Sequence, residues 1–183
     1  MEILKTNIEG LIQIVPVVFH DSRGWFFEFF KSSKFQAVTG GHSFSQDNIS
    51  FSTPNVLRGL HLQIAPSEQA KLVMVITGRV LDVVVDLRKG SPTFGKTFQV
   101  ELNGQSKNML YIPEGFAHGF AALEESCFLY KCSTEYNPKN ETGIIWNDPD
   151  LNIDWKIRNP IVSDKDKQLP TLKELLVKSV ISQ

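Results

Sequence analysis

The middle of the chain consists of short hydrophobic runs separated by turn residues, a pattern that predicts β-strands. Two runs rich in β-branched residues, 71–76 and 79–88, flank Thr77 and Gly78, and a third at 94–102 is followed by Asn103-Gly104. Short strands at this spacing, with little helical periodicity between them, are typical of an antiparallel sandwich or barrel. The prediction is an all-β core.

The second of these runs also predicts how its sheet is placed. Val83 and Val85 alternate with Asp82, Val84 and Asp86 along 79–88. Successive side chains of a strand point to opposite faces. We therefore expect one buried face and one face that lines a polar space.

Helical patterns are confined to two short segments. Residues 32–41 are expected to form a short helix that stops at its glycines, and residues 171–182 a C-terminal helix. Thr171 and Glu174 have the spacing of a capping box at the start of the second helix.

Length and charge limit the possible organisation. The 183 residues contain no repeat or linker pattern, so residues 1–183 are predicted to form one domain. A net charge of −1 argues against a general electrostatic nucleic-acid surface, and an anionic ligand would need a local cluster of cations.

The expected compartment is the cytoplasm. No run approaches the roughly twenty apolar residues that span a bilayer, and the first residues lack the order of a signal peptide. Cys127 and Cys132 are five residues apart on one predicted strand, which places them on opposite faces and predicts two reduced thiols.

The run RGLHLQ at 58–63 is the first candidate for chemistry. His61 and Gln63 share a face if this segment is extended. An imidazole and an amide are poorly suited to a dry core, where each buried polar group needs a partner. We therefore expect a polar pocket that includes Arg58 and His61.

A second histidine occurs in PEGFAHGF at 113–120, whose P-x-G-x-x-H spacing resembles that of the metal-binding β-barrels called cupins. Gln63 and Lys71 stand where a cupin has further metal ligands. His61 and His118 are then the only two plausible ligands, fewer than zinc or iron normally requires. No metal and no cofactor are expected.

Three further side chains could serve acid–base chemistry near His61. Lys71 could bind an anion or stabilise charge on a carbonyl oxygen, and Tyr130 could donate a proton to a carbanion. Tyr130 and Tyr136 could both equally be aromatic core or surface residues.

Polar recognition residues occur in two other stretches. Arg23 and Glu28 lie among aromatic residues in 19–30, where a strand with a turn at Arg23-Gly24 is expected. Gln46, Asp47 and Asn48 add amide and carboxylate groups. An arginine can bind phosphate bidentately, and a carboxylate can accept from sugar hydroxyls.

Together these motifs resemble the dTDP-4-dehydrorhamnose 3,5-epimerase family over about residues 19–166. The matching motifs are F-x-D-x-R-G with Glu28 (19–28), SQDN (45–48), VLRGLHLQ (56–63), QAKLV (69–73), SPTFG (91–95), YIPEGFAHGF (111–120), FLYK (128–131), GIIWNDP (143–149) and SDKD (163–166). Family members often have an aromatic residue where this chain has Leu62, which should face away from His61 and affect packing only.

The resemblance implies a metal-free, homodimeric jelly-roll of the cupin type. It would invert C3 and C5 of dTDP-4-dehydro-6-deoxy-D-glucose to give dTDP-4-dehydro-L-rhamnose, in dTDP-L-rhamnose synthesis. By position, His61 would be the general base, and Asp166 would be the carboxylate that orients it and raises its basicity. Tyr130 would be the proton donor on the opposite face of the sugar, and Lys71 would lie near the enolate. Tyr136 would stack on thymine, and substrate-binding positions would be held by Arg23, Glu28, Gln46, Asp47, Asn48, Arg58, His118, Glu141 and Lys165.

Several alternatives remain open from the sequence. Asp82 and Asp86 are rivals of Asp166 as the partner of His61. Two alternatives to the double epimerase are a related enzyme that inverts only C3 or C5, and a jelly-roll that binds a nucleotide sugar without catalysis. The sequence also permits, without requiring it, an exchange of N-terminal strands between subunits.

Overall fold

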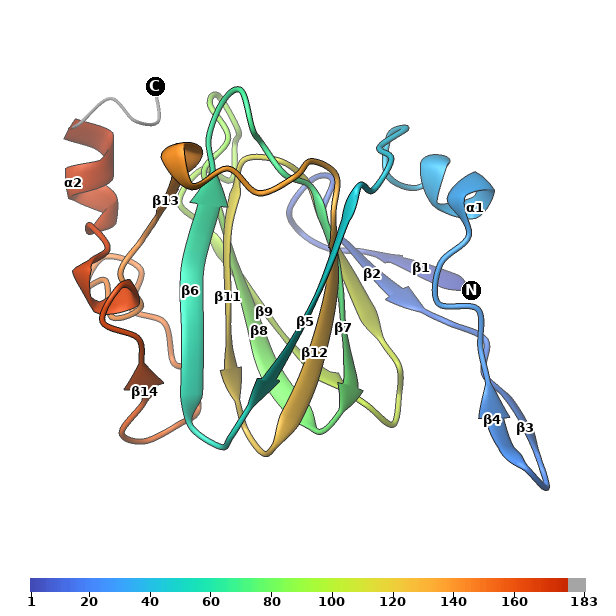
Figure 1. The fold of residues 1–183 in the computed structure, drawn as a ribbon. Coiled ribbons are helices and arrows are strands. Elements are labelled where there is room, and N and C mark those ends of the chain that lie inside the picture. Colours follow the sequence, from blue (N-terminus) through green and yellow to red (C-terminus); the bar gives the residue numbers. More distant parts are fainter. Residues whose placement is uncertain (178–183) are drawn as a thin grey trace.

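The computed structural model describes residues 1–177, in which two antiparallel sheets face each other (Figure 1). The first sheet has the order β1-β2-β10-β7-β12-β5. Its strands are β1 (Glu2–Lys5), β2 (Ile12–Val15), β10 (Met109–Ile112), β7 (Lys71–Thr77), β12 (Ser126–Cys132) and β5 (Gln46–Ser52).

The second sheet has the order β13-β6-β11-β8-β9, and β14 pairs in parallel with the edge of β6. The strands are β13 (Glu141–Gly143), β6 (Val56–Gln63), β11 (Phe116–Ala122), β8 (Arg79–Asp86), β9 (Thr97–Asn103) and β14 (Ile161–Val162). The expected all-β, cupin-type jelly-roll is confirmed.

The strands on either side of Gly78 do not form a hairpin. β7 pairs with β10 and β12 in the first sheet, whereas β8 pairs with β11 and β9 in the second. Gly78 has a positive φ, and a Cβ there would lie 2.0 Å from the Glu125 carbonyl oxygen. The glycine turn therefore carries the chain from one sheet to the other.

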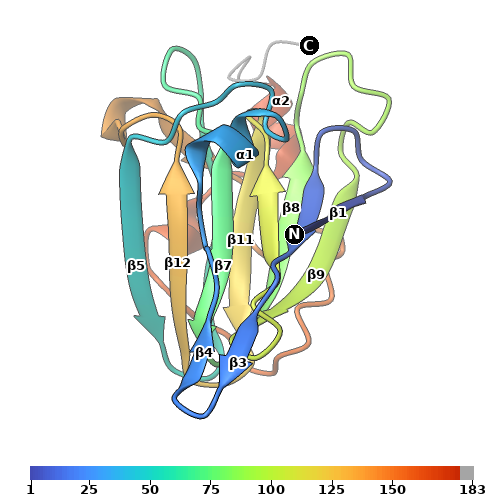
Figure 2. The same ribbon diagram turned by 90° about the vertical axis from the view of Figure 1, so that its right-hand side faces the viewer.

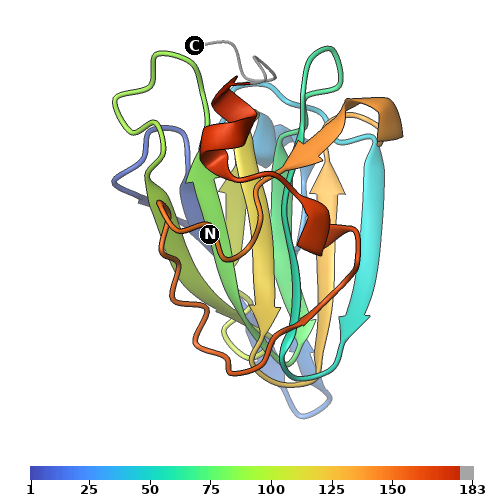
Figure 3. The same cartoon turned by 90° about the vertical axis from the view of Figure 1, so that its left-hand side faces the viewer.

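Both faces of β8 are buried, which corrects the expectation of one buried face. Val84 packs between the sheets with Val80 and Phe128. Val83 and Val85 lie on the outer face of the second sheet, beneath the segment after β13, which crosses this face in Figure 3. On the same inner face, Asp82 contacts His118, which lines a polar cavity between the sheets.

The outer face of the first sheet is covered by the segment that contains α1 (Ser32–Gln36), as Figure 2 shows. Phe35 of this helix packs with Leu72 and Met109. The helix ends at Gln36, earlier than predicted, and residues 37–41 form turns.

At the other end of the chain, α2 (Leu172–Val177) begins with the predicted capping box. The backbone N–H of Glu174 donates to Thr171 Oγ1, and that of Thr171 donates to a Glu174 carboxylate oxygen. The remainder of the predicted helix, 178–182, lies outside the described residues.

Three smaller elements complete the described chain. These are the hairpin of β3 (Phe19–Asp21) and β4 (Gly24–Phe26) and two 3₁₀ turns, η1 (Pro138–Asn140) and η2 (Asp166–Gln168). Cys127 and Cys132 are both free thiols, as predicted. No helix within residues 1–177 is long and apolar enough to cross a membrane.

Candidate active site

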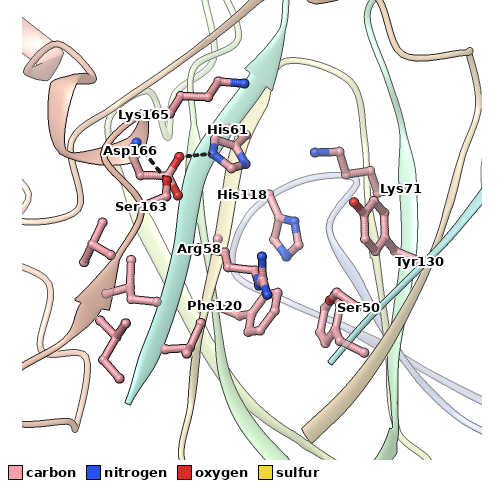
Figure 4. Close-up of a pocket in the computed structure, with 16 residues that line it drawn as sticks. Ser50, Arg58, His61, Lys71, His118, Phe120, Tyr130, Ser163, Lys165 and Asp166 are labelled. Carbon is pink, nitrogen blue, oxygen red and sulfur yellow. Dashed lines mark hydrogen bonds and ion pairs between the residues drawn. The ribbon is translucent and has the colours of Figure 1, made fainter. Parts of the chain in front are cut away.

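A cavity opens between the two sheets, with β5 at the edge of the first sheet and β6, flanked by β13 and β14, in the second. Its first lobe has a volume of about 530 Å³ and its second about 290 Å³. His61, Lys71 and Tyr130 line both lobes, so the two spaces form one site around these side chains. Figure 4 shows His61 on β6 facing Lys71 and Tyr130, which come from the opposite sheet.

A β-bulge in β6 brings Arg58 to the same face as His61. His118 is paired with His61 and Phe120 with Arg58, so two residues of β6 oppose the single residue Gly119 of β11. Without the extra residue, side chains three positions apart would point to opposite faces. Leu62 packs in the core on the outer face, as predicted from simple alternation.

Gly59 is required at this bulge. Its φ is +109°, and a Cβ would lie 2.6 Å from both the Gly119 Cα and the His118 carbonyl oxygen. Its backbone N–H donates to Asp166 Oδ2 at 3.1 Å. The same glycine therefore permits the close approach of β6 to β11 and holds the carboxylate beside His61.

Asp166 is the hydrogen-bond partner of His61, with 2.7 Å between His61 Nε2 and Asp166 Oδ1. Its own backbone N–H donates to Ser163 Oγ. Burial opposes ionisation of Asp166, but the hydrogen bonds from His61 and Gly59 outweigh it, and the pKa lies below its ordinary value. A carboxylate in this position fixes the tautomer and orientation of the imidazole.

The two rival aspartates have other partners. Asp82 Oδ2 lies 2.9 Å from His118 Nε2. Asp86 accepts hydrogen bonds from Arg88, Ser91 and Thr93. The hydrogen-bond partner of His61 is therefore Asp166, and not Asp82 or Asp86.

Lys71 is a buried ammonium in the cavity wall, only 9% exposed. Its Nζ forms no hydrogen bond or ion pair within residues 1–177. Burial lowers the pKa of Lys71, against the opposing charges of Asp82 and Glu141. Such a group suits an oxygen that becomes negative during a reaction.

Tyr130 lies across the cavity from His61 (Figure 4). Burial raises the pKa of its phenol, which therefore stays protonated at neutral pH. The site thus pairs an imidazole that can accept a proton with a phenol that can donate one from the opposite side.

The second lobe is lined by polar side chains at the rim. Gln46 Oε1 accepts from the backbone N–H of Tyr136, and the Tyr136 hydroxyl donates to Glu141 at 2.5 Å. Lys165 forms an ion pair with the same carboxylate. Burial tends to raise the pKa of Glu141, but the hydrogen bonds from Lys165 and Tyr136 leave it below its ordinary value.

Most of the predicted substrate-binding residues border the cavity, and three do not. The cavity is lined by Gln46, Asn48, Arg58, His118, Tyr136, Glu141 and Lys165. Asp47 alternates with Gln46 and Asn48, is exposed, and forms an ion pair with Lys131. Arg23 is paired with Asp21 at the tip of the β3–β4 hairpin, and Glu28 with Lys34.

Several contributors were not identified from the sequence. Ser50, Phe120 and Phe128 line the first lobe. Ser163 and the Gly59 N–H hold Asp166. A glycine inside a strand pattern is a sequence signal for a bulge, and Ser three residues before Asp is a signal for a local turn.

The described residues contain no cluster of three or more His, Cys, Asp or Glu side chains placed to hold a metal ion. His61 and His118 each use Nε2 to contact an aspartate instead. The donor set thus favours proton transfer over metal coordination.

Comparison with known proteins identifies the family. The family model "dTDP-4-dehydrorhamnose 3,5-epimerase" matches residues 5–174. A protein of that name from Shigella flexneri is 48% identical over 168 residues, which cover 91% of this chain and 93% of the relative.

Two solved structures bear on the ligand. A dTDP-6-deoxy-D-glucose-3,5-epimerase from Legionella pneumophila, in complex with dTDP-4-keto-L-rhamnose, has a TM-score of 0.93 and 41% identity, covering 98% of this chain and 96% of that one. A 3′-monoepimerase from Streptomyces bikiniensis, in complex with dTDP-quinovose, has a TM-score of 0.90 and 34% identity, covering 96% of this chain and 90% of that one. The chain belongs to the dTDP-4-dehydrorhamnose 3,5-epimerase family.

Proposed function

We propose that the chain is an isomerase that inverts C3 and C5 of dTDP-4-dehydro-6-deoxy-D-glucose, giving dTDP-4-dehydro-L-rhamnose for dTDP-L-rhamnose biosynthesis. The observation that carries this function is the placement of His61 and Tyr130 on opposite walls of one cavity, with the unpaired Lys71 ammonium beside them. Epimerisation next to a ketone needs a base on one face of the ring, an acid on the other, and a cation near the ketone oxygen.

In the proposed reaction, His61 removes the proton from the carbon next to the ketone. The electron pair of the broken C–H bond moves toward the C4 oxygen as an enolate, which the Lys71 ammonium stabilises. Tyr130 then donates its proton to the same carbon from the other face, and proton exchange with solvent restores both side chains. The second carbon undergoes the same sequence, and no cofactor is needed.

Asp166 supports this cycle through His61. Its carboxylate contacts Nε2, so the other ring nitrogen, Nδ1, is the one left to take the substrate proton. The negative charge stabilises the imidazolium that forms. Asp166 is buried, which strengthens its interaction with the partly exposed His61.

Nucleotide binding is assigned to the polar and cationic side chains of the cavity rim. Arg58 and Lys165 supply positive charge for a diphosphate, and Tyr136 offers an aromatic face for thymine. Tyr136 is half exposed, with 46% of its surface open, which leaves its ring available for stacking. Gln46, Asn48, His118 and Glu141 complete the proposed binding set.

A homodimer would give the remaining predicted residues a role. The β3–β4 hairpin projects from the barrel (Figure 1) with Phe19, Trp25 and Phe26 more than half exposed. Exposed aromatic surface of this kind favours burial against a partner. We therefore assign Arg23 and Glu28, which lie outside the cavity of their own chain, and Asp47 to binding or contact at a site shared with a second copy.

The cytoplasmic location belongs to the same proposal. Cys127 and Cys132 are free thiols, which are typical of a reducing compartment.

The test is incubation with dTDP-4-keto-6-deoxy-D-glucose in deuterated water, followed by proton NMR of C3 and C5. Exchange with inversion at both carbons is expected. Binding of the nucleotide sugar with no exchange would contradict the catalytic role.

Inversion at one carbon would point to the alternative, a mono-epimerase. This alternative has one specific observation in its favour, since the 3′-monoepimerase has the same fold at a TM-score of 0.90. The backbone therefore does not distinguish the two reactions, and the NMR experiment does.

A further inference from the structure

Gln63 lines the second lobe of the cavity, two residues after His61 on the same strand. Its side chain is buried, with 4% of the residue exposed. The proposed mechanism gives this amide no role, although it stands where a metal-binding relative of the fold would have a ligand.

Only one end of the Gln63 amide is satisfied. Oε1 accepts a hydrogen bond from the backbone N–H of Asn137 at 3.0 Å. Nε2 has no acceptor among the described residues. The bond to Asn137 fixes which end of the amide is the donor, so two N–H groups are left without a partner.

Unpartnered buried polar atoms are rare, and three of the four in the described residues lie at the cavity. Four such side-chain atoms occur within residues 1–177: Thr39 Oγ1, Ser50 Oγ, Gln63 Nε2 and Asp82 Oδ1. Ser50 and Gln63 line the cavity, and Asp82 holds His118 in its wall. A buried donor without an acceptor costs stability, so its persistence beside a cavity points to a ligand that supplies the acceptor.

We propose that Gln63 is a substrate-positioning residue whose amide N–H donates to an oxygen of the substrate's hexose. The acceptor is assigned to the hexose because Gln63 lies two residues from His61 on the same strand face, beside the groups that act on the sugar ring. Tyr136, the proposed thymine platform, lines the same lobe, and the measurement of dTDP affinity separates the two parts of the substrate. Because Gln63 Nε2 is buried in the cavity wall, the proposal requires the amide to turn toward the sugar on binding. This inference rests on the proposed epimerase function.

Gln63 also has a structural contact that must be separated from this role. Asn137 caps η1, and the same loop carries Tyr136, the proposed thymine platform. Loss of the Asn137 contact would weaken binding of the nucleotide, whereas loss of the amide donor would weaken only the binding of the hexose.

Two substitutions separate these contributions. Gln63→Met removes both ends of the amide, and Gln63→Glu keeps an oxygen for Asn137 while removing the donor. We expect both to lower kcat/KM for dTDP-4-keto-6-deoxy-D-glucose by about tenfold. The Kd of dTDP, which lacks the hexose, should stay within about twofold of the wild-type value for Gln63→Glu.

Gln69 provides the matched control. It lines the same lobe, but its Nε2 already donates to the Thr134 carbonyl oxygen at 2.8 Å. Gln69→Met should lower the melting temperature while leaving kcat/KM within about twofold.

Three outcomes would overturn the inference. The first is unchanged kcat/KM in Gln63→Glu, and the second is a loss of dTDP affinity in that variant that parallels the loss of kcat/KM. The third is an equal loss of kcat/KM in Gln69→Met. If Gln63→Met does not fold, the kcat/KM and the dTDP affinity of Gln63→Glu alone test the inference. Failure of the proposed function is distinct, since the wild-type protein itself would then exchange no substrate hydrogens.

Discussion

His61 and His118 face each other across adjacent antiparallel strands, and each contacts a different buried aspartate through Nε2. His61 pairs with Asp166 from a 3₁₀ turn, whereas His118 pairs with Asp82 from a neighbouring strand of the same sheet. The cavity therefore contains two histidine–aspartate pairs of similar geometry; His61 of the first is the proposed base, and His118 of the second belongs to the proposed binding set.

The two pairs give the first prediction. Asp166→Asn should lower kcat by on the order of 10²–10⁴, because an amide neither fixes the required tautomer nor stabilises the imidazolium. Asp82→Asn, which alters the pair proposed to bind substrate, should mainly raise KM. Equal effects of both substitutions on kcat, measured by NMR progress curves, would contradict the assignment of His61 as the base.

Tyr130→Phe should uncouple exchange from inversion. The His61–Asp166 pair can still remove a proton and return deuterium from solvent to the same face, so exchange at the carbons next to the ketone should continue. Inversion should fall by about 10²–10⁴, because the donor on the other face is gone. Proton NMR in deuterated water reports both rates, and a parallel loss of the two would assign Tyr130 to binding.

Local patterns in the sequence predicted β6 only in part. Alternation correctly placed His61 on one face and Leu62 on the other. Alternation alone would have excluded Arg58 from the face of His61, because the bulge that realigns it depends on the close contact between Gly59 and Gly119. Gly59 within a strand pattern signals a bulge, but its contact joins segments sixty residues apart, and no local pattern identifies Gly119 as the partner.

Long-range relationships show the same limit. The Thr77-Gly78 turn was recognisable, but not that its two strands enter different sheets. Asp166 could be matched to His61, 105 positions earlier, through the family resemblance and not through spacing. The strands follow from local propensity, whereas the site depends on which strands the chain brings together.

Lys71→Met should separate stability from activity. The folded state lowers the pKa of Lys71 through burial, so folding with the ammonium charged is unfavourable, and the cost declines as pH rises. Replacing it with an apolar side chain should raise the melting temperature at neutral pH. Turnover should fall by about 10²–10³ because the enolate loses its cation.

The measurements are differential scanning calorimetry and the NMR assay, with Lys131→Met as the control. Lys131 neighbours Leu72 across β12 and β7 and pairs with the exposed Asp47, outside the cavity. A stabilised and fully active Lys71→Met protein would exclude Lys71 from catalysis.

Asp86 should make the protein sensitive to acid independently of the active site. It is fully buried and accepts hydrogen bonds from Arg88, Ser91 and Thr93. Burial raises its pKa, but these bonds outweigh burial and lower the pKa from 3.8 to about 2. Because the folded-state value lies below the unfolded one, the stabilisation is fully present above pH 3.8 and is lost as pH falls toward 2.

The shift corresponds to about 2 kcal/mol of unfolding free energy. The free energies of unfolding of the wild type and of Asp86→Asn, measured in urea, should therefore differ by a constant amount above about pH 5. Near pH 2 this difference should have changed by about 2 kcal/mol, because the wild type has lost the stabilisation. The other titrating groups are common to both proteins and cancel in the difference. Parallel curves down to pH 2 would show that Asp86 has the same proton affinity folded and unfolded, and that the Arg88 network stabilises the fold without favouring the ionised carboxylate.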